Sequence, residues 1–303
     1  MTMRAFLLPT VLLALLVAPA SAREITHAMG VTEVPDNPQR IVVLTNEATE
    51  ALLALGVVPA GAVESYNGDP WYDYLMPMMD GVAFLGAEAA VNVELLAALE
   101  PDLILGTKVR QEALYEQLSA IAPTVMTETV GVVWQDNFRL YADVVGKAAE
   151  GEAALAAFAD RTETIGAALG DQVNEEISFV RFAPAGARIY HRASFPSVIL
   201  EQIGFRRPPA QNGDTFSETI AKERIPDMAG DRIFYISNDD YGAEAEENLA
   251  DWLSEPLWLS LEAVQNGKAQ RVSEGIWISG GGLYSANMTL DDIERIYGIE
   301  STR

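Results

Sequence analysis

Basic residues are scarce in this chain, but arginines gather in its second half. The 303 residues include 44 acidic and 20 basic side chains, yet five arginines fall close together at Arg181, Arg188, Arg192, Arg206 and Arg207. Guanidinium groups bind anionic oxygens through paired, charge-assisted hydrogen bonds. Arg181 ends a predicted strand, and Arg188 shares one face of the next predicted strand with Tyr190. We therefore expect Arg181, Arg188 and Tyr190 to contact an anionic ligand; the alternative for each arginine is a surface salt bridge. Arg206 and Arg207 precede two prolines, which favours a surface loop.

Aromatic residues near predicted strand ends form a second candidate group. Tyr66 and Trp71 lie in a polar loop after a strand, Trp134 precedes a long helical pattern, and Trp277 lies shortly before the triplet Gly280–Gly282. Aromatic faces suit a bulky ligand with apolar surfaces, so these four residues are predicted to form walls of the binding site. No Lys and Ser/Thr pair follows the glycines, and the triplet is therefore interpreted as a loop and not as a phosphate cradle.

The composition argues against several functions. A net charge of −24 disfavours nucleic acid and anionic lipid as partners. The sequence has no cysteine, no Gly-x-Ser-x-Gly motif and only two histidines, His27 and His191. Protein-held transition metals need several nitrogen or sulfur ligands, so we expect no metal site of the protein's own. His191, beside Tyr190, is interpreted as a satisfied or surface histidine; contact with a haem is the alternative.

The N-terminus has the pattern of a secretory signal. Arg4 is followed by an apolar run and then by Ala20-Ser21-Ala22, a small-x-small cleavage site. The run is short for a membrane span, which is the alternative. We expect residues 1–22 to be removed, leaving a soluble monomer that begins at Arg23 in a bacterial periplasm. Because there is no cysteine, we expect no lipid-modified cysteine and therefore no lipoprotein.

Strands alternate with helices on both sides of a long helical pattern. This alternation predicts two α/β lobes with mostly parallel sheets, residues 23–147 and 170–303. The apolar stripe over residues 148–169 predicts one rigid helix of roughly 33 Å that links the lobes. Thr289, followed by Asp291 and Asp292, predicts the start of a final helix that ends at Gly298.

A repeated spacing relates the two lobes. Glu94 lies eight residues before Asp102, just ahead of a predicted strand, and Glu223 lies eight residues before Asp231, also ahead of a strand. The matched spacing predicts that the two glutamates occupy equivalent surface positions. Capping of a helix start is the alternative for each.

The same segments carry a family resemblance. Residues 40–44 (RIVVL), 92–106 (NVELLAALEPDLILG), 225–234 (IPDMAGDRIF) and 258–264, with residues 180–200, resemble the periplasmic binding proteins for ferric siderophores. Those are class III solute-binding proteins of ABC uptake systems, with cobalamin and haem binders as relatives. The resemblance implies two lobes joined by a rigid helix, no catalysis, no intrinsic cofactor, and a ferric siderophore whose own oxygens hold the iron. It also implies that Glu94 and Glu223 dock on the permease. A haem or corrinoid binder of the same fold, or a periplasmic α/β enzyme, is the alternative function.

Overall fold

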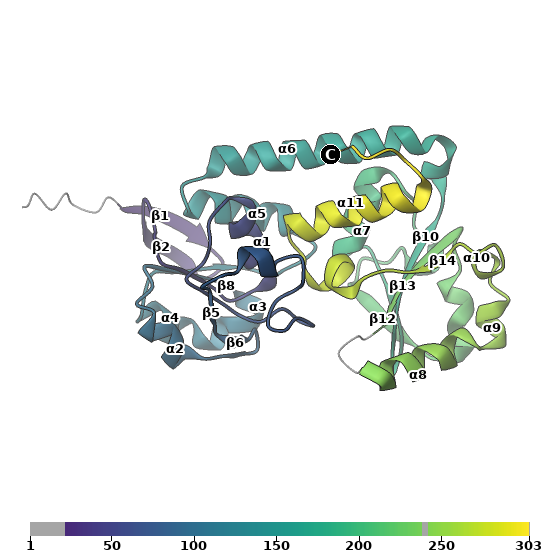
Figure 1. Cartoon of the computed structure of the whole chain (residues 1–303), viewed down its shortest axis with the longest axis horizontal. Coiled ribbons are helices and arrows are strands. Elements are labelled where there is room, and N and C mark those ends of the chain that lie inside the picture. Colours follow the sequence, from purple (N-terminus) through teal and green to yellow (C-terminus); the bar gives the residue numbers. More distant parts are fainter. Residues whose placement is uncertain (1–21, 238–241, 303) are drawn as a thin grey trace, which may run out of the picture.

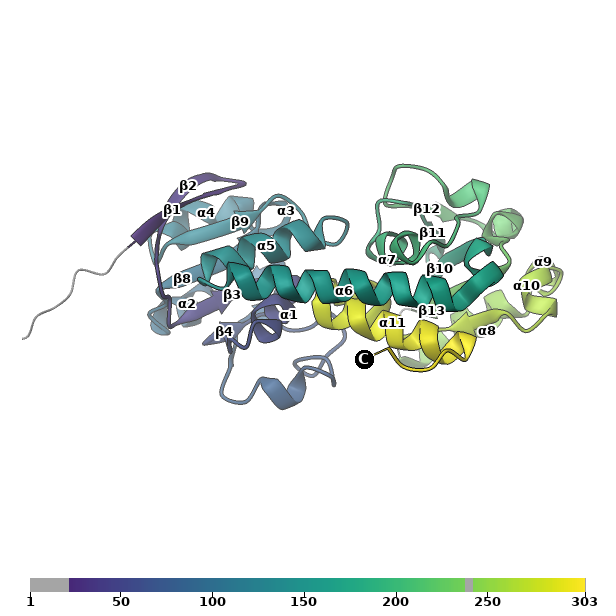
Figure 2. The same cartoon turned by 90° about the horizontal axis from the view of Figure 1, so that it is seen from above.

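Two α/β lobes lie side by side under one long helix. The computed structural model describes residues 22–237 and 242–302. Helix α6 (Ala148–Leu169) runs along both lobes and has the bounds that its apolar stripe predicts (Figure 1, Figure 2). Leu155, Phe158 and Ile165 on its inner face are buried in the main core. The predicted two-lobed fold is thereby confirmed. Apart from Ala22, the predicted signal peptide lies outside the described residues.

The sheet of the N-terminal lobe is parallel throughout. Its strand order is β5-β4-β3-β8-β9, with bounds Ala83–Phe84, Gly61–Ala62, Ile41–Val43, Leu103–Thr107 and Thr124–Thr127. β3 and β8 are fully buried, as expected of strands that helices cover on both faces.

The helices of this lobe are α1 (Asn46–Ala54), α2 (Val93–Ala98), α3 (Lys108–Gln111), α4 (Tyr115–Ser119) and α5 (Trp134–Val144). Two hairpins complete it, β1 (Ala22–His27) with β2 (Gly30–Pro35), and β6 (Gly86–Ala87) with β7 (Ala90–Val91).

The sheet of the C-terminal lobe is mixed, which corrects the prediction of a mostly parallel sheet there. Its strand order is β12-β11-β10-β13-β14, with bounds Ser217–Ile220, Gly186–Tyr190, Ile177–Ala183, Arg232–Ser237 and Ala269–Arg271. β13 is parallel to β10 and β14, whereas β11 is antiparallel to β10 and β12. Only Pro184 and Ala185 separate β10 from β11, and so short a connection allows only a hairpin. The helices are α7 (Phe195–Ile203), α8 (Gly242–Leu253), α9 (Pro256–Leu259) and α10 (Glu262–Gln265).

The repeated spacing corresponds to a repeated contact. The Asp102 carboxylate accepts hydrogen bonds from the backbone N–H groups of Gln39 and Arg40, at 2.7 and 2.9 Å, just before β3. The Asp231 carboxylate accepts from the backbone N–H of Glu176 at 2.7 Å, just before β10. Each aspartate thus fixes the start of the central strand of its own sheet. Asp102 and Asp231 therefore make equivalent contacts in the two lobes.

The last helix begins earlier than predicted and forms a second connection between the lobes. α11 spans Leu283–Tyr297, with Gly282 as its N-cap. Thr289 is buried within the helix, where its hydroxyl donates to the Ser285 carbonyl at 3.0 Å and does not cap the N-terminus. α11 runs beside α6 and reaches α1 of the N-terminal lobe (Figure 1, Figure 2). On its α6 side, Glu294 of α11 accepts a hydrogen bond from buried Arg161 at 2.9 Å.

Short helical turns complete the described structure. They are η1 (Met76–Met78), η2 (Glu112–Leu114), η3 (Gly170–Asn174), η4 (Pro209–Gln211), η5 (Lys222–Met228) and η7 (Gly275–Ser279). Within the described ranges, no helix is long and apolar enough to cross a membrane.

Candidate ligand-binding site

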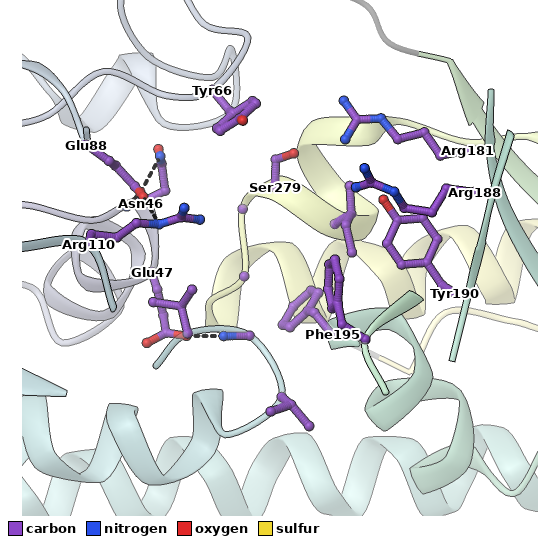
Figure 3. Close-up of a pocket in the computed structure, with 17 residues that line it drawn as sticks. Asn46, Glu47, Tyr66, Glu88, Arg110, Arg181, Arg188, Tyr190, Phe195 and Ser279 are labelled. Carbon is purple, nitrogen blue, oxygen red and sulfur yellow. Dashed lines mark hydrogen bonds and ion pairs between the residues drawn. The ribbon is translucent and has the colours of Figure 1, made fainter. Parts of the chain in front are cut away.

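A pocket opens between the two lobes. It contains about 880 Å³ of empty space, part of it open to solvent. Figure 3 shows two facing walls, with Tyr66, Asn46, Glu88, Arg110 and Glu47 on one side and Arg181, Arg188, Tyr190 and Phe195 on the other. Ser279, on the segment that precedes α11, lies between them. In α/β proteins a ligand site is expected where the carboxyl ends of strands meet a crevice, and the N-terminal wall follows β3 and β8 in this way.

The wall of the C-terminal lobe carries two arginines directly opposite each other. Arg181 on β10 pairs with Arg188 on β11 in the antiparallel register. Tyr190 lies two residues beyond Arg188, on the same face, so the structure brings together three of the predicted site residues. Like charges at directly opposite positions destabilise a sheet, and an anion placed between them would relieve that repulsion. Arg181 forms an ion pair with Glu274, which is fully buried; Arg188 is half-buried.

The Tyr190 hydroxyl stays protonated at neutral pH. Burial raises its pKa, and the charges of Arg181 and Arg188 only partly offset that rise. Its ring meets Phe216 edge-on, with 5.3 Å between ring centroids, and both residues line the pocket. The wall therefore presents two guanidinium groups, one of them paired with Glu274, together with a neutral hydroxyl and an aromatic ring.

Apart from Tyr66, the wall of the N-terminal lobe is made of residues that the sequence analysis did not select. Asn46 and Glu47 begin α1 directly after β3, Arg110 lies on α3 after β8, and Glu88 lies in the β6–β7 turn. One Glu88 carboxylate oxygen accepts from the Asn46 backbone N–H at 2.7 Å and from its Nδ2 at 2.9 Å. The other oxygen lies 3.5 Å from Arg110 Nε. The sequence could have indicated these residues, because they follow predicted strands. Asn46 and Glu47 were not selected because polar and acidic residues are common in the first turn of any helix.

Glu47 is a buried carboxyl group with an unusual titration. Its oxygens accept from the Gly131 backbone N–H at 2.9 Å and from Asn137 Nδ2 at 2.6 Å. Burial raises the pKa of Glu47 to about 8, although both hydrogen bonds lower it; the nearby carboxylates of Glu88 and Glu50 add to the rise. Glu47 is therefore mostly neutral at pH 7, which suits a pocket for an anion.

The tryptophan predictions need correction. Tyr66 is 59% exposed and lines the pocket as expected, whereas Trp71, Trp134 and Trp277 are buried in the main core and are not among the lining residues. Trp71 donates to the Val63 carbonyl at 3.3 Å and Trp277 donates to Asp292 at 2.8 Å. Trp134 packs edge-on behind Phe195, with 6.0 Å between centroids. Large indole rings gain more from a closed core than from an open cleft, so these three support the walls from behind.

The remaining arginine and histidine predictions have mixed outcomes. Arg206 is exposed, as expected for a surface loop, but Arg207 is buried and donates to the Tyr190 carbonyl. Arg207 thus supports the strand that carries the arginine wall. His191 is buried, with its Nδ1 2.6 Å from Thr215 Oγ1, but its Nε2 is buried without a hydrogen-bond partner among the described residues, so only one of its ring nitrogens is satisfied.

Metal-ligating side chains do not gather anywhere in the part of the chain that the structure describes. Residues 22–237 and 242–302 contain no group of three or more His, Cys, Asp or Glu that could hold a metal ion.

Comparison with known proteins places the chain in a family. The model of the periplasmic binding protein family matches residues 41–271. The chain belongs to this family. It is 48% identical over 290 residues to YfiY, a probable siderophore-binding lipoprotein of Bacillus subtilis (strain 168), covering 93% of this chain and 89% of the relative. It is 31% identical over 273 residues to the achromobactin-binding periplasmic protein of Dickeya dadantii (strain 3937), covering 86% and 87% of the two chains.

A solved structure extends the similarity to three dimensions. Staphylococcus aureus SirA complexed with staphyloferrin B matches this periplasmic binding protein with a TM-score of 0.85 and 33% identity, covering 92% of this chain and 99% of SirA. The relative YfiY is named a lipoprotein, which differs from the unlipidated form expected from the absence of cysteine here.

The two glutamates predicted to dock on a permease lie on the surface, one in each lobe. Glu94 is exposed in the first turn of α2, and Glu223 is exposed in the first turn of η5. Glu223 also borders a surface hollow with Lys222, Asp251 and Trp252. Neither glutamate lines the pocket that contains Arg181.

Proposed function

We propose that this periplasmic binding protein captures an anionic ferric siderophore between its lobes and delivers it to an ABC permease. The observation that carries the proposal is the cross-strand pair of Arg181 and Arg188, whose side chains both face the pocket (Figure 3). Arg110 adds a third guanidinium from the opposite wall. These three guanidinium groups gather in a chain with a net charge of −24, and the cluster suits an anion even though Arg181 and Arg110 are ion-paired with Glu274 and Glu88.

A siderophore with carboxylate groups fits this arrangement best. Carboxylates accept paired hydrogen bonds from guanidinium groups, so free carboxylates of a ferric chelate would be held on both sides of the cleft. Two relatives supply ligands to test, since one is named for binding achromobactin and SirA was solved with staphyloferrin B. The chelate's own oxygens would hold the iron, and the protein would provide charge, hydrogen bonds and shape.

A fluorescence titration tests this proposal. Trp277 lies directly behind the pocket-lining residues Ile278 and Ser279, so a bound ferric chelate should quench its emission. The panel should include ferric staphyloferrin B, ferric citrate, a ferric hydroxamate, haem and cobalamin. We expect saturable quenching with the carboxylate chelates at the lowest concentrations. Tighter binding of haem or cobalamin would assign the site to the other branch of the fold, and no binding at all would reject the proposal.

Delivery is proposed to use Glu94 and Glu223. Each is exposed in its own lobe, eight residues before an aspartate that fixes a strand start, and this arrangement suits a permease that presents one arginine to each lobe. The mature protein is proposed to be an unlipidated periplasmic monomer that begins at Arg23. Intact-mass measurement on periplasmic material checks the last point, and a retained N-terminal segment would contradict it.

A further inference from the structure

The glycine triplet before α11 packs against a buried carboxyl group of the other lobe. A Cβ atom on Gly280 would lie 2.6 Å from Glu50 Oε1 and from the Tyr74 hydroxyl, and one on Gly282 would lie 2.6 Å from Glu50 Cβ. Real Cβ atoms do not approach other atoms this closely. Glycines at 280 and 282 therefore allow the backbone that lines the pocket to reach Glu50, which is fully buried on α1.

Glu50 performs the task of a helix cap for α11. The N-cap residue of α11 is Gly282, which has no side chain to accept a hydrogen bond from the first turn. Glu50 Oε2 accepts instead from the Ser285 backbone N–H at 2.9 Å and from the Ser285 hydroxyl at 3.0 Å. Burial raises the pKa of Glu50 although these hydrogen bonds lower it, so the cap consists of hydrogen bonds and does not depend on a full negative charge. The cap comes from 235 residues away in the sequence and from the opposite lobe.

The other oxygen of Glu50 is connected through two tyrosines to Tyr66 on the N-terminal wall of the pocket. Oε1 accepts from the Tyr74 hydroxyl at 2.5 Å. The Tyr74 ring stacks on Tyr72 with 5.3 Å between centroids, and the Tyr72 hydroxyl accepts from the Tyr66 backbone N–H at 3.4 Å. Contacts thus run without interruption from Glu50 to Tyr66, which lines the pocket.

We infer that Glu50 is a positioning residue for the ligand pocket, capping α11 from across the lobe boundary and so holding two of the pocket's walls. The first is the segment 278–281, which carries Ser279 between the two facing walls, and the second is the loop of the N-terminal wall that carries Tyr66. Glu50 itself does not line the pocket. Its effect on a ligand is therefore indirect. The binding part of this inference rests on the proposed function; the placement of the two walls does not.

Two substitutions at position 50 and one matched control test the inference. In Glu50→Gln the amide oxygen can still accept from Ser285, and the amide nitrogen can donate to Tyr74. Glu50→Ala removes every one of these contacts. The control is Glu294→Ala, which also deletes a buried carboxylate, but one that α11 itself carries on its α6 side, where it contacts Arg161 and Thr302 and does not line the pocket.

The first readout is the dissociation constant for ferric staphyloferrin B. We expect Glu50→Ala to raise it by about tenfold or more, because unsatisfied buried donors at Ser285 and Tyr74 would shift both walls. Glu50→Gln and Glu294→Ala should bind like the wild type. If Glu50→Ala binds as tightly as the wild type, or if Glu294→Ala loses as much affinity, Glu50 has only a general structural role.

The second readout needs no ligand. Hydrogen exchange of backbone amides at residues 279–286 should be faster in Glu50→Ala and unchanged in Glu294→Ala. Unchanged exchange in Glu50→Ala overturns the inference even if the wild type binds no chelate, so failure of the proposed function can be told apart. If Glu50→Ala does not fold, Tyr74→Phe keeps the ring and removes one hydroxyl. It should still speed exchange in this segment, and no change there overturns the inference too.

Discussion

Replacing Arg188 by alanine should weaken ligand binding without weakening the fold. Arg188 is half-buried and faces Arg181 across two strands. Removing one of two like charges relieves repulsion, so the melting temperature should stay the same or rise slightly. A charge-assisted hydrogen bond that is buried on binding contributes about 1.5–3 kcal/mol. Its loss should therefore raise the dissociation constant for an anionic ferric chelate by roughly 10- to 150-fold.

The assay is a fluorescence titration paired with thermal unfolding of the same samples. Arg206→Ala is the matched control, because Arg206 lies in the same lobe, is exposed, and bonds Asn174 outside the pocket. It makes the same change in net charge and should leave the dissociation constant within about twofold, because Arg206 is exposed and does not line the pocket, and exposed charges are screened by salt. An unchanged dissociation constant in Arg188→Ala would refute the reasoning. Equal losses of affinity in Arg188→Ala and Arg206→Ala would mean that net charge, and not a contact in the pocket, determines the affinity.

Three further predictions concern Glu47, Arg181 and the pair of Glu94 and Glu223. Glu47 holds its proton in the folded state up to a pKa of about 8, against 4.5 for the ordinary group. Its contribution to stability should therefore fall between those pH values by about 1.4 kcal/mol per pH unit and level off above pH 8; Glu47→Gln should remove this slope in urea unfolding measured from pH 5 to pH 9. Arg181→Ala should destabilise the fold by about 3–5 kcal/mol, because it removes the guanidinium that faces buried Glu274, and a loss below about 1 kcal/mol in urea unfolding would contradict this. Each exposed ion pair contributes only about 0.2–1 kcal/mol, so Glu94 and Glu223 are changed to alanine together. The double variant should reduce iron uptake in cells and leave the dissociation constant for the ligand unchanged, because neither residue lines the pocket. Normal uptake would mean that the two glutamates are helix caps.

The features that were predictable from sequence are those with a local or periodic signal. The apolar stripe of α6 gives its bounds, because 22 residues keep one face toward the core. The spacing from Glu94 to Asp102 and from Glu223 to Asp231 indicates the repeat, because each aspartate fixes a strand start within its own lobe. Arg188 and Tyr190 share a face because strand side chains alternate, and the short turn before them places Arg181 opposite.

The features that were missed depend on contacts between distant segments. In the sequence, nothing near Trp134 or Trp277 distinguishes a core tryptophan from one that lines a pocket. Their core positions become visible only in the structure, where Phe195 packs against Trp134 and Phe234 packs against Trp277. Arg110 lies on a short helix with no periodic signal, so nothing local distinguishes it from a surface arginine. The start of α11 was placed too late because its capping group, Glu50, belongs to the other lobe.

The most direct test of the central claim is a competition measured by native mass spectrometry. The purified protein would be mixed with equal amounts of ferric staphyloferrin B, a ferric hydroxamate, haem and cobalamin, each in excess. We predict one dominant complex, a protein monomer with one ferric staphyloferrin B, and its loss in the variant that replaces both Arg181 and Arg188 by lysine, because lysine cannot form the paired hydrogen bonds. A dominant complex with haem or cobalamin, or a siderophore complex that survives the double substitution, would contradict the account.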